Sequence, residues 1–145
     1  MPSVWGISPR QSIEAECEQR GKRTVVSGCI NLLKGGTADD ELILALAGPA
    51  AEQVLAGGAG GRNGYWPRVW GARGLLYAWE DRAASMVVRA TADESWRVRE
   101  MALKVIARHL IGDAISSVEE LQGDPVARVR AAAHRALVAL TVAHA

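Results

Sequence analysis

Apolar residues recur at helical spacing through most of the chain. In the segment that begins at Asp93, Val98, Ala102, Val105 and Ile106 follow the i, i+4, i+7, i+8 spacing of one helix face. No period-two alternation of apolar and polar residues lasts long enough to indicate a strand. The pattern therefore predicts an all-α chain with about seven to nine helices.

Shorter segments with the same kind of apolar face lie before and after this helix. Their apolar positions are Ala83, Val87 and Ala90 in one segment and Ile115, Val118 and Leu121 in the other. Helical spacing and capping residues also mark residues 21–56, although less regularly. The glycine-rich run at 57–64 is predicted to be a flexible connection, inside a single domain that covers residues 1–145.

One sequence motif, called the repeated phrase below, occurs twice in the chain. DESWRVREMALKVI begins at Asp93 and DPVARVRAAAHRAL begins at Asp124, 31 residues later. The pairs that match in this register include Asp93 with Asp124, Arg97 with Arg128, Val98 with Val129, Arg99 with Arg130 and Ala102 with Ala133. A weaker third copy places Arg68, Gly71 and Arg73 at the positions of Arg99, Ala102 and Lys104. Residues 62–145 are therefore predicted to be regular two-helix repeats, as expected of helical arrays.

Each repeat has a predicted start signal and a predicted arginine contact. Asp93 and Asp124 are expected to be helix N-caps, with Pro125 at the first helical position. Arg99 and Arg130 lie three residues before a small residue, as Arg68 does. Their guanidinium groups are expected to bind carboxylates or carbonyl groups of a neighbouring repeat.

These residues resemble the HEAT repeat group, in particular its short HEAT-like or bilin-lyase-type members. The resemblance covers residues 62–145, and residues 21–56 only by pattern. It implies a right-handed α-solenoid whose second helices line a concave binding surface; some members are bilin lyases and some relatives excise alkylated bases. The period of 31 is shorter than the roughly 40–47 residues of ordinary HEAT units. Arg62 also stands where the turn aspartate is expected, and Pro67 replaces the first valine.

Composition excludes some classes of partner. Lys and Arg total 17 against 16 Asp and Glu, so no overall field attracts nucleic acid or a membrane surface. No apolar run approaches the roughly 18 residues of a membrane span. Cys17 and Cys29 have no neighbouring Cys-x-x-Cys partner, and the first residues contain no apolar signal segment, so a cytoplasmic location with reduced thiols is expected.

The leading functional hypothesis is a non-enzymatic scaffold that binds a protein. In the 31-residue register Arg82 corresponds to Asp113, and Arg89 corresponds to Glu120. A surface that changes sign in this way suits a mixed-charge protein partner better than a polyanion. Tryptophan is enriched at interface hot spots, so Trp66 and Trp70 are candidate anchors.

The alternative is a nucleic-acid-binding or DNA-repair-related protein with a basic helix face. Its candidate phosphate-binding residues, all expected to face water, are Arg73, Lys104, Arg108, Arg128 and Arg135. Positive charge along such a face would contact the backbone of a duplex, as the resemblance to base-excising relatives implies. Protein binding and nucleic-acid binding both stay open at this point.

Catalysis has little support in the sequence. Base excision would need a carboxylate beside aromatic residues, and Glu80 and Asp81 next to Trp79 are the nearest candidates. His109, His134 and His144 stand singly, without other residues at metal-ligand spacing. No enzyme activity, metal or cofactor is therefore predicted.

The final predicted helix has apolar residues that need to be buried. The sequence RALVALTVAHA contains Arg135 as its only full charge, and no second helix of this repeat follows that could cover Leu137, Leu140 and Val142. Terminal repeats normally have a polar outer face. A homodimer through this helix is the favoured cover, with the N-terminal section or a different protein as the alternatives.

Overall fold

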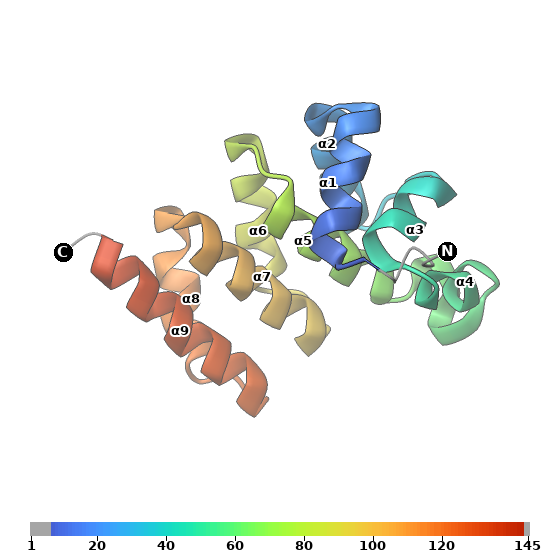
Figure 1. Cartoon of the computed structure of the whole chain (residues 1–145). Helices are drawn as coiled ribbons and strands as arrows, with labels where there is room; N and C mark the ends of the chain where they lie inside the picture. The colour runs from blue at the N-terminus through green and yellow to red at the C-terminus, as the bar shows by residue number, and fades with distance from the viewer. Residues whose placement is uncertain (1–6, 144–145) are drawn as a thin grey trace. The chain divides into compact units, whose positions relative to one another are not determined.

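The computed structural model describes residues 7–143, and this part of the protein is helical with no strand. Nine α-helices and three short 3-10 helices follow one another within these residues (Figure 1). The predicted all-α class is confirmed. The protein divides into two compact units, Met1–Ala83 and Ala84–Ala145, which are described separately below.

The N-terminal unit is built from five α-helices in its described part. They are α1 (Pro9–Arg20), α2 (Lys22–Leu33), α3 (Asp40–Ala47), α4 (Ala50–Leu55) and α5 (Trp66–Tyr77), with 3-10 helices η2 (Gly58–Asn63) and η3 (Asp81–Ala83). Helices α2 and α5 form its closest packing. A Cβ atom at Gly71 would lie 2.7 Å from the carbonyl oxygen of Cys29, which shows how near the two backbones come. The glycine at this position therefore permits the central contact of the unit.

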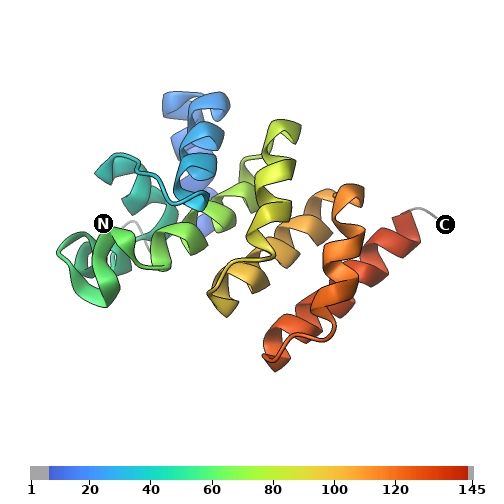
Figure 2. The same ribbon diagram turned by 180° about the vertical axis from the view of Figure 1, so that it is seen from behind.

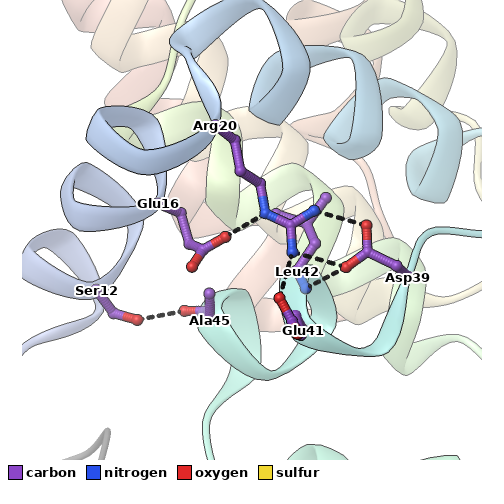
Figure 3. Close-up of polar contacts among 7 residues, drawn as sticks. All are labelled: Ser12, Glu16, Arg20, Asp39, Glu41, Leu42 and Ala45. Carbon is purple, nitrogen blue, oxygen red and sulfur yellow. Dashed lines mark hydrogen bonds and ion pairs between the residues drawn. The ribbon is translucent and has the colours of Figure 1, made fainter.

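Polar contacts join α1 to α3 at both ends of α3 (Figure 3). The Ser12 hydroxyl donates to the Ala45 carbonyl oxygen at 2.7 Å, and Arg20 donates to Glu16 and to Asp39, at 2.6 Å in each case. The Asp39 carboxylate also accepts from the Leu42 backbone N–H at 2.9 Å, which makes Asp39 the N-cap of α3. The hydrogen bond from Arg20 is the main reason that the pKa of Asp39 lies below its ordinary value. The Arg20 bonds fix the N-terminus of α3 against α1, and the Ser12 bond fixes its last turn.

The C-terminal unit contains four α-helices in the part that the structure describes. They are α6 (Ala84–Ala90), α7 (Trp96–His109), α8 (Ile115–Leu121), which follows the 3-10 helix η4 (Gly112–Ala114), and α9 (Ala127–Ala143). Helix α9 packs along α7 and also contacts α8 (Figure 2). Val98, Leu103, Val118 and Leu140 are all fully buried. The apolar face predicted for α7 is therefore buried. The face predicted for α8 is buried only at Val118, because Ile115 is 41% exposed and Leu121 is partly buried.

The two copies of the repeated phrase adopt the same turn. Asp93 accepts from the Ser95 backbone N–H at 2.8 Å, and Asp124 accepts from that of Val126 at 2.9 Å. These Asx turns lie just before α7 and α9, which begin at Trp96 and Ala127. The prediction that the two aspartates are N-caps, with Pro125 at the first helical position, is therefore wrong by two residues. The physical reason is that an aspartate can hydrogen-bond the backbone two residues on, which competes with capping.

The two arginines of the repeat also bond alike. Arg99 Nη1 donates to the carbonyl oxygens of Asp93 and Glu94, at 2.9 and 3.2 Å. Arg130 Nη1 donates to those of Asp124 and Pro125, at 2.8 and 3.1 Å. Arg99 additionally holds both oxygens of Asp124, with Nε to Oδ2 at 2.8 Å and Nη2 to Oδ1 at 3.2 Å. The predicted arginine contact to a carboxylate of the next repeat is confirmed at Arg99.

The Asp124 carboxylate should make stability depend on pH. Burial acts to raise its pKa, but hydrogen bonds from Arg99 and the Val126 N–H hold the pKa below its ordinary value. The bonds therefore stabilise the fold above about pH 4, and that contribution is lost as the pH falls further. Asp124→Asn should lower the free energy of unfolding by about 1.5 kcal/mol at pH 7.

Urea unfolding between pH 7 and pH 3 measures this difference. The gap between wild type and Asp124→Asn should narrow below about pH 4, because the wild-type carboxyl becomes protonated. Asp113→Asn is the matched control, since Asp113 is exposed and should change stability little. A gap that stays constant down to pH 3 would contradict a role for the ionised carboxylate.

Two segments differ from the sequence-based predictions. Helix α1 was not predicted at all, although Ser8 and Gln11 form a capping box with Pro9 at the first helical position. The glycine-rich run 57–64 forms η2, packs on α4 and lies inside the N-terminal unit. The prediction of one continuous solenoid domain over 1–145 stays a prediction.

The final helix covers part of its own apolar surface. Leu140 is fully buried within the protein and Leu137 is partly buried, so the expectation that Leu140 needs an outside cover is wrong. The reason is that α9 turns this face toward α7 and α8. Val138 and Val142 remain exposed, at 48% and 70%. The outer face of α9 is therefore the apolar surface that is left.

Candidate functional site

A pocket in the N-terminal unit brings together residues from both functional hypotheses. Its volume is about 330 Å³. It is lined by Ala47, Ala50, Gln53, Val54, Gly58, Ala59, Trp66, Trp70 and Arg73. This volume falls at the lower end of the range for small-ligand pockets. The walls come from α4, η2 and α5, so the glycine-rich run forms one side of it.

Two tryptophans, Trp66 and Trp70, form one wall of this pocket, which we call the Trp66 pocket. Trp70 is buried, at 4% exposure, whereas Trp66 is only partly buried. Their rings stack with centroids 6.2 Å apart and planes 21° apart, and Tyr65 lies against Trp66 at 5.1 Å. The buried ring supports the accessible one, so Trp66 presents a rigid aromatic surface.

Arg73 closes the pocket on the side of α3. Its Nη2 donates to the Leu46 carbonyl oxygen at 2.6 Å, and burial lowers the pKa of its guanidinium. The prediction that Arg73 faces water is therefore wrong. The reason is that α3 packs on α5 and leaves the Leu46 carbonyl within reach of this side chain.

The other predicted partner-binding residues do not join this pocket. Arg82 is bound to Glu80 at 2.7 Å, to the Ser27 hydroxyl at 2.8 Å and to the Arg23 carbonyl oxygen at 3.0 Å. Arg89, Asp113 and Glu120 belong to the C-terminal unit, where all three are exposed. None of these three forms an ion pair with another described residue. The exposed charges of that unit are therefore of both signs.

The predicted phosphate-binding residues do not form one open basic face. Apart from Arg73, they lie in the C-terminal unit, with Lys104 partly buried and Arg108 and Arg135 exposed. Arg128 donates to Glu100 at 2.9 Å and lies 5.3 Å from the centre of the Trp96 ring. Part of the positive charge is therefore neutralised within the unit.

The predicted catalytic candidates are engaged with neighbours. Glu80 pairs with Arg82, and the Asp81 carboxylate accepts from Trp79 Nε1 at 3.0 Å. Asp81 is exposed, so nothing around it resembles the apolar, enclosed site that would adapt a carboxyl for proton transfer. Within residues 7–143 no cluster of His, Cys, Asp and Glu has the arrangement of a metal site.

A second cavity, which the sequence analysis missed, lies beside α2 in the same unit. It measures about 480 Å³ and is lined by Arg20, Thr24, Ser27, Asn31, Lys34, Asp39, Arg82 and five further residues. Arg20 and Arg82 are already bound to carboxylates there, so their charges are largely balanced. This cavity is open, and it lacks the aromatic wall of the Trp66 pocket.

Sequence reasoning found the tryptophans of the pocket but not the opposite wall. Ala47, Ala50 and Gln53 carry no chemical signature, and the glycine run indicated a connection instead of a folded segment. In the structure Gly57 adopts a left-handed backbone, at φ 105°, so the chain turns sharply here. The turn brings Gly58 and Ala59 opposite Trp66 and Trp70.

Comparisons with family models, curated proteins and solved structures find no match for this chain. Among the described helices, none has the length and apolar character that crossing a membrane requires.

Proposed function

We propose that the protein is a non-enzymatic HEAT-like repeat scaffold that binds a protein partner through the Trp66 pocket. The observation that carries this proposal is the stack of a partly exposed Trp66 on a buried Trp70 at the edge of a 330 Å³ pocket. Aromatic anchors in such pockets dominate the binding energy of many protein interfaces. The HEAT-like assignment is supported by the two equivalent Asx turns and arginine contacts, 31 residues apart.

The partner chemistry that fits the pocket is an apolar or aromatic side chain. Val54 and the two indole rings form an apolar lining, while the Arg73 guanidinium is held by a carbonyl group. An inserted side chain would be desolvated against the indole faces, which is the arrangement of an interface hot spot. The exposed Gln53 can orient the neighbouring backbone of the partner through its side-chain amide.

Substituting Trp66 should abolish most of this binding. Trp66→Ala is expected to weaken the affinity for the partner at least about tenfold, because it removes the accessible ring. The partner is first captured from lysate of the native host on immobilised wild-type protein, and its affinity for each purified variant is then measured. Trp79→Ala is the matched control, since Trp79 lies outside the pocket and its indole N–H bonds Asp81.

A second variant distinguishes loss of binding from unfolding of the protein. Ala50 is exposed and lines the pocket, so Ala50→Gln should fill the space without disturbing the core. We expect it to weaken binding as Trp66→Ala does, with an unchanged circular dichroism spectrum. A partner retained equally by wild type, Trp66→Ala and Ala50→Gln would contradict the proposal. The nucleic-acid alternative would be favoured by a different result. In that case the protein would bind duplex DNA, the affinity would fall with salt, and the double variant Lys104→Glu/Arg135→Glu would not bind.

A further inference from the structure

Arg130 repeats the geometry of Arg99 without the carboxylate that Arg99 binds. In both arginines Nη1 is held by two carbonyl oxygens of the preceding Asx turn. In Arg99 the remaining nitrogens, Nε and Nη2, hold the two oxygens of Asp124. The same nitrogens of Arg130 have no hydrogen-bond partner among the described residues, and Arg130 is exposed. The side chain is thus already oriented for a carboxylate.

The helix around Arg130 offers a surface for close packing. Its exposed residues include Ala127, Ala131, Val138 and Val142, all of them small or apolar. Within the C-terminal unit, the equivalent helix α7 is covered by α9, whose preceding turn supplies Asp124 to Arg99. The C-terminal unit therefore contains its own example of how such a face is covered.

We propose that the outer face of α9 is a docking surface for a helical segment of another protein whose preceding turn presents an aspartate to Arg130. The carboxylate would accept from Nε and Nη2 of Arg130, as Asp124 does from Arg99. The following helix would lie along the small and apolar residues of α9. This surface lies on the C-terminal unit and does not depend on the Trp66 pocket.

Charge explains why the occupant is acidic and is not a second α9. Helix α9 contains Arg128, Arg130 and Arg135 but no aspartate or glutamate. Two copies of this helix placed face to face would bring like charges together, which disfavours the homodimer predicted from the sequence. A partner with an acidic turn instead supplies the opposite charge at Arg130, whose Nε and Nη2 bind no described residue.

The test attaches to α9 a further copy of the repeat, which presents an aspartate to Arg130. In an extended protein, residues 112–143 are repeated directly after Val142, which keeps the 31-residue period and places a second Asp-Pro turn opposite Arg130. We expect the extension to fold and to raise the urea midpoint. In this protein Arg130→Gln should lower the equilibrium constant for folding about tenfold, as expected for a charged hydrogen-bonded pair. In the protein without the extension, the same substitution should change it less than about twofold.

Two controls make the outcome decisive. Arg135→Gln, on the same helix and also exposed, should have a small effect in both proteins, and replacing the added aspartate by asparagine should reproduce the loss seen with Arg130→Gln. An unfolded extension, or an equal effect of Arg130→Gln in both proteins, would overturn the proposal. So would a dimer of the unextended protein, measured by light scattering, that becomes monomeric in Val138→Glu.

Discussion

Replacing Ala133 by aspartate is expected to destabilise the C-terminal unit by about 3 kcal/mol or more. Ala133 has no exposed surface in the folded protein, and it lies on α9, which packs on α7 and α8. A carboxylate there would lose its water without gaining a partner. Circular dichroism during urea unfolding measures the change, and Ala102→Asp, at the equivalent position of α7, is expected to behave in the same way.

The control for this prediction is Ala131→Asp. Ala131 lies two residues earlier on the same helix but is exposed, so it measures the helix-propensity cost of aspartate, about 0.7 kcal/mol, without burial. The difference between the two variants isolates the cost of burying the charge. Equal unfolding midpoints for Ala131→Asp and Ala133→Asp would show that the buried face of α9 is assigned incorrectly.

The repeated phrase could be interpreted from sequence because it combines two kinds of signal. Apolar spacing identified the buried positions Val98 and Ala102, and the repeat register identified Arg99 as a contact between repeats. Both signals depend on local periodicity, which a sequence shows directly. The exact place of Asp124 was missed, because capping and an Asx turn use the same residue type and differ only in backbone geometry.

The candidate pocket could be predicted only in part. Trp66 and Trp70 are distinctive residues, so their role in recognition was a natural expectation. Whether Arg73 points outward or inward depends on how α3 packs on α5, and that is a contact between segments far apart in the sequence. Long-range packing of this kind has no periodic signature, which is why one side of the pocket was predicted and the other was not.

Gly71 illustrates how packing distinguishes residues that the repeat treats as equivalent. In the repeat register it occupies the small position of Ala102 and Ala133. Only at Gly71 does a neighbouring backbone come so close that a Cβ atom would lie 2.7 Å from the Cys29 carbonyl oxygen and 3.1 Å from the Leu33 nitrogen. The repeat predicts a small residue, and the approach of α2 to α5 requires that it be glycine.

Gly71→Ala is therefore expected to destabilise the N-terminal unit by about 3 kcal/mol, although alanine alone would favour the helix. Gly74→Ala is the comparison, because its Cβ would lie 2.4 Å from the Cys29 Sγ atom, which belongs to a side chain. Adding Cys29→Ala should thus relieve much of the cost of Gly74→Ala but none of the clash of Gly71→Ala with the backbone. Urea unfolding of Gly71→Ala and Gly74→Ala, each with and without Cys29→Ala, measures both effects. If Cys29→Ala relieved the two glycine substitutions equally, the result would contradict the backbone contact between α2 and α5.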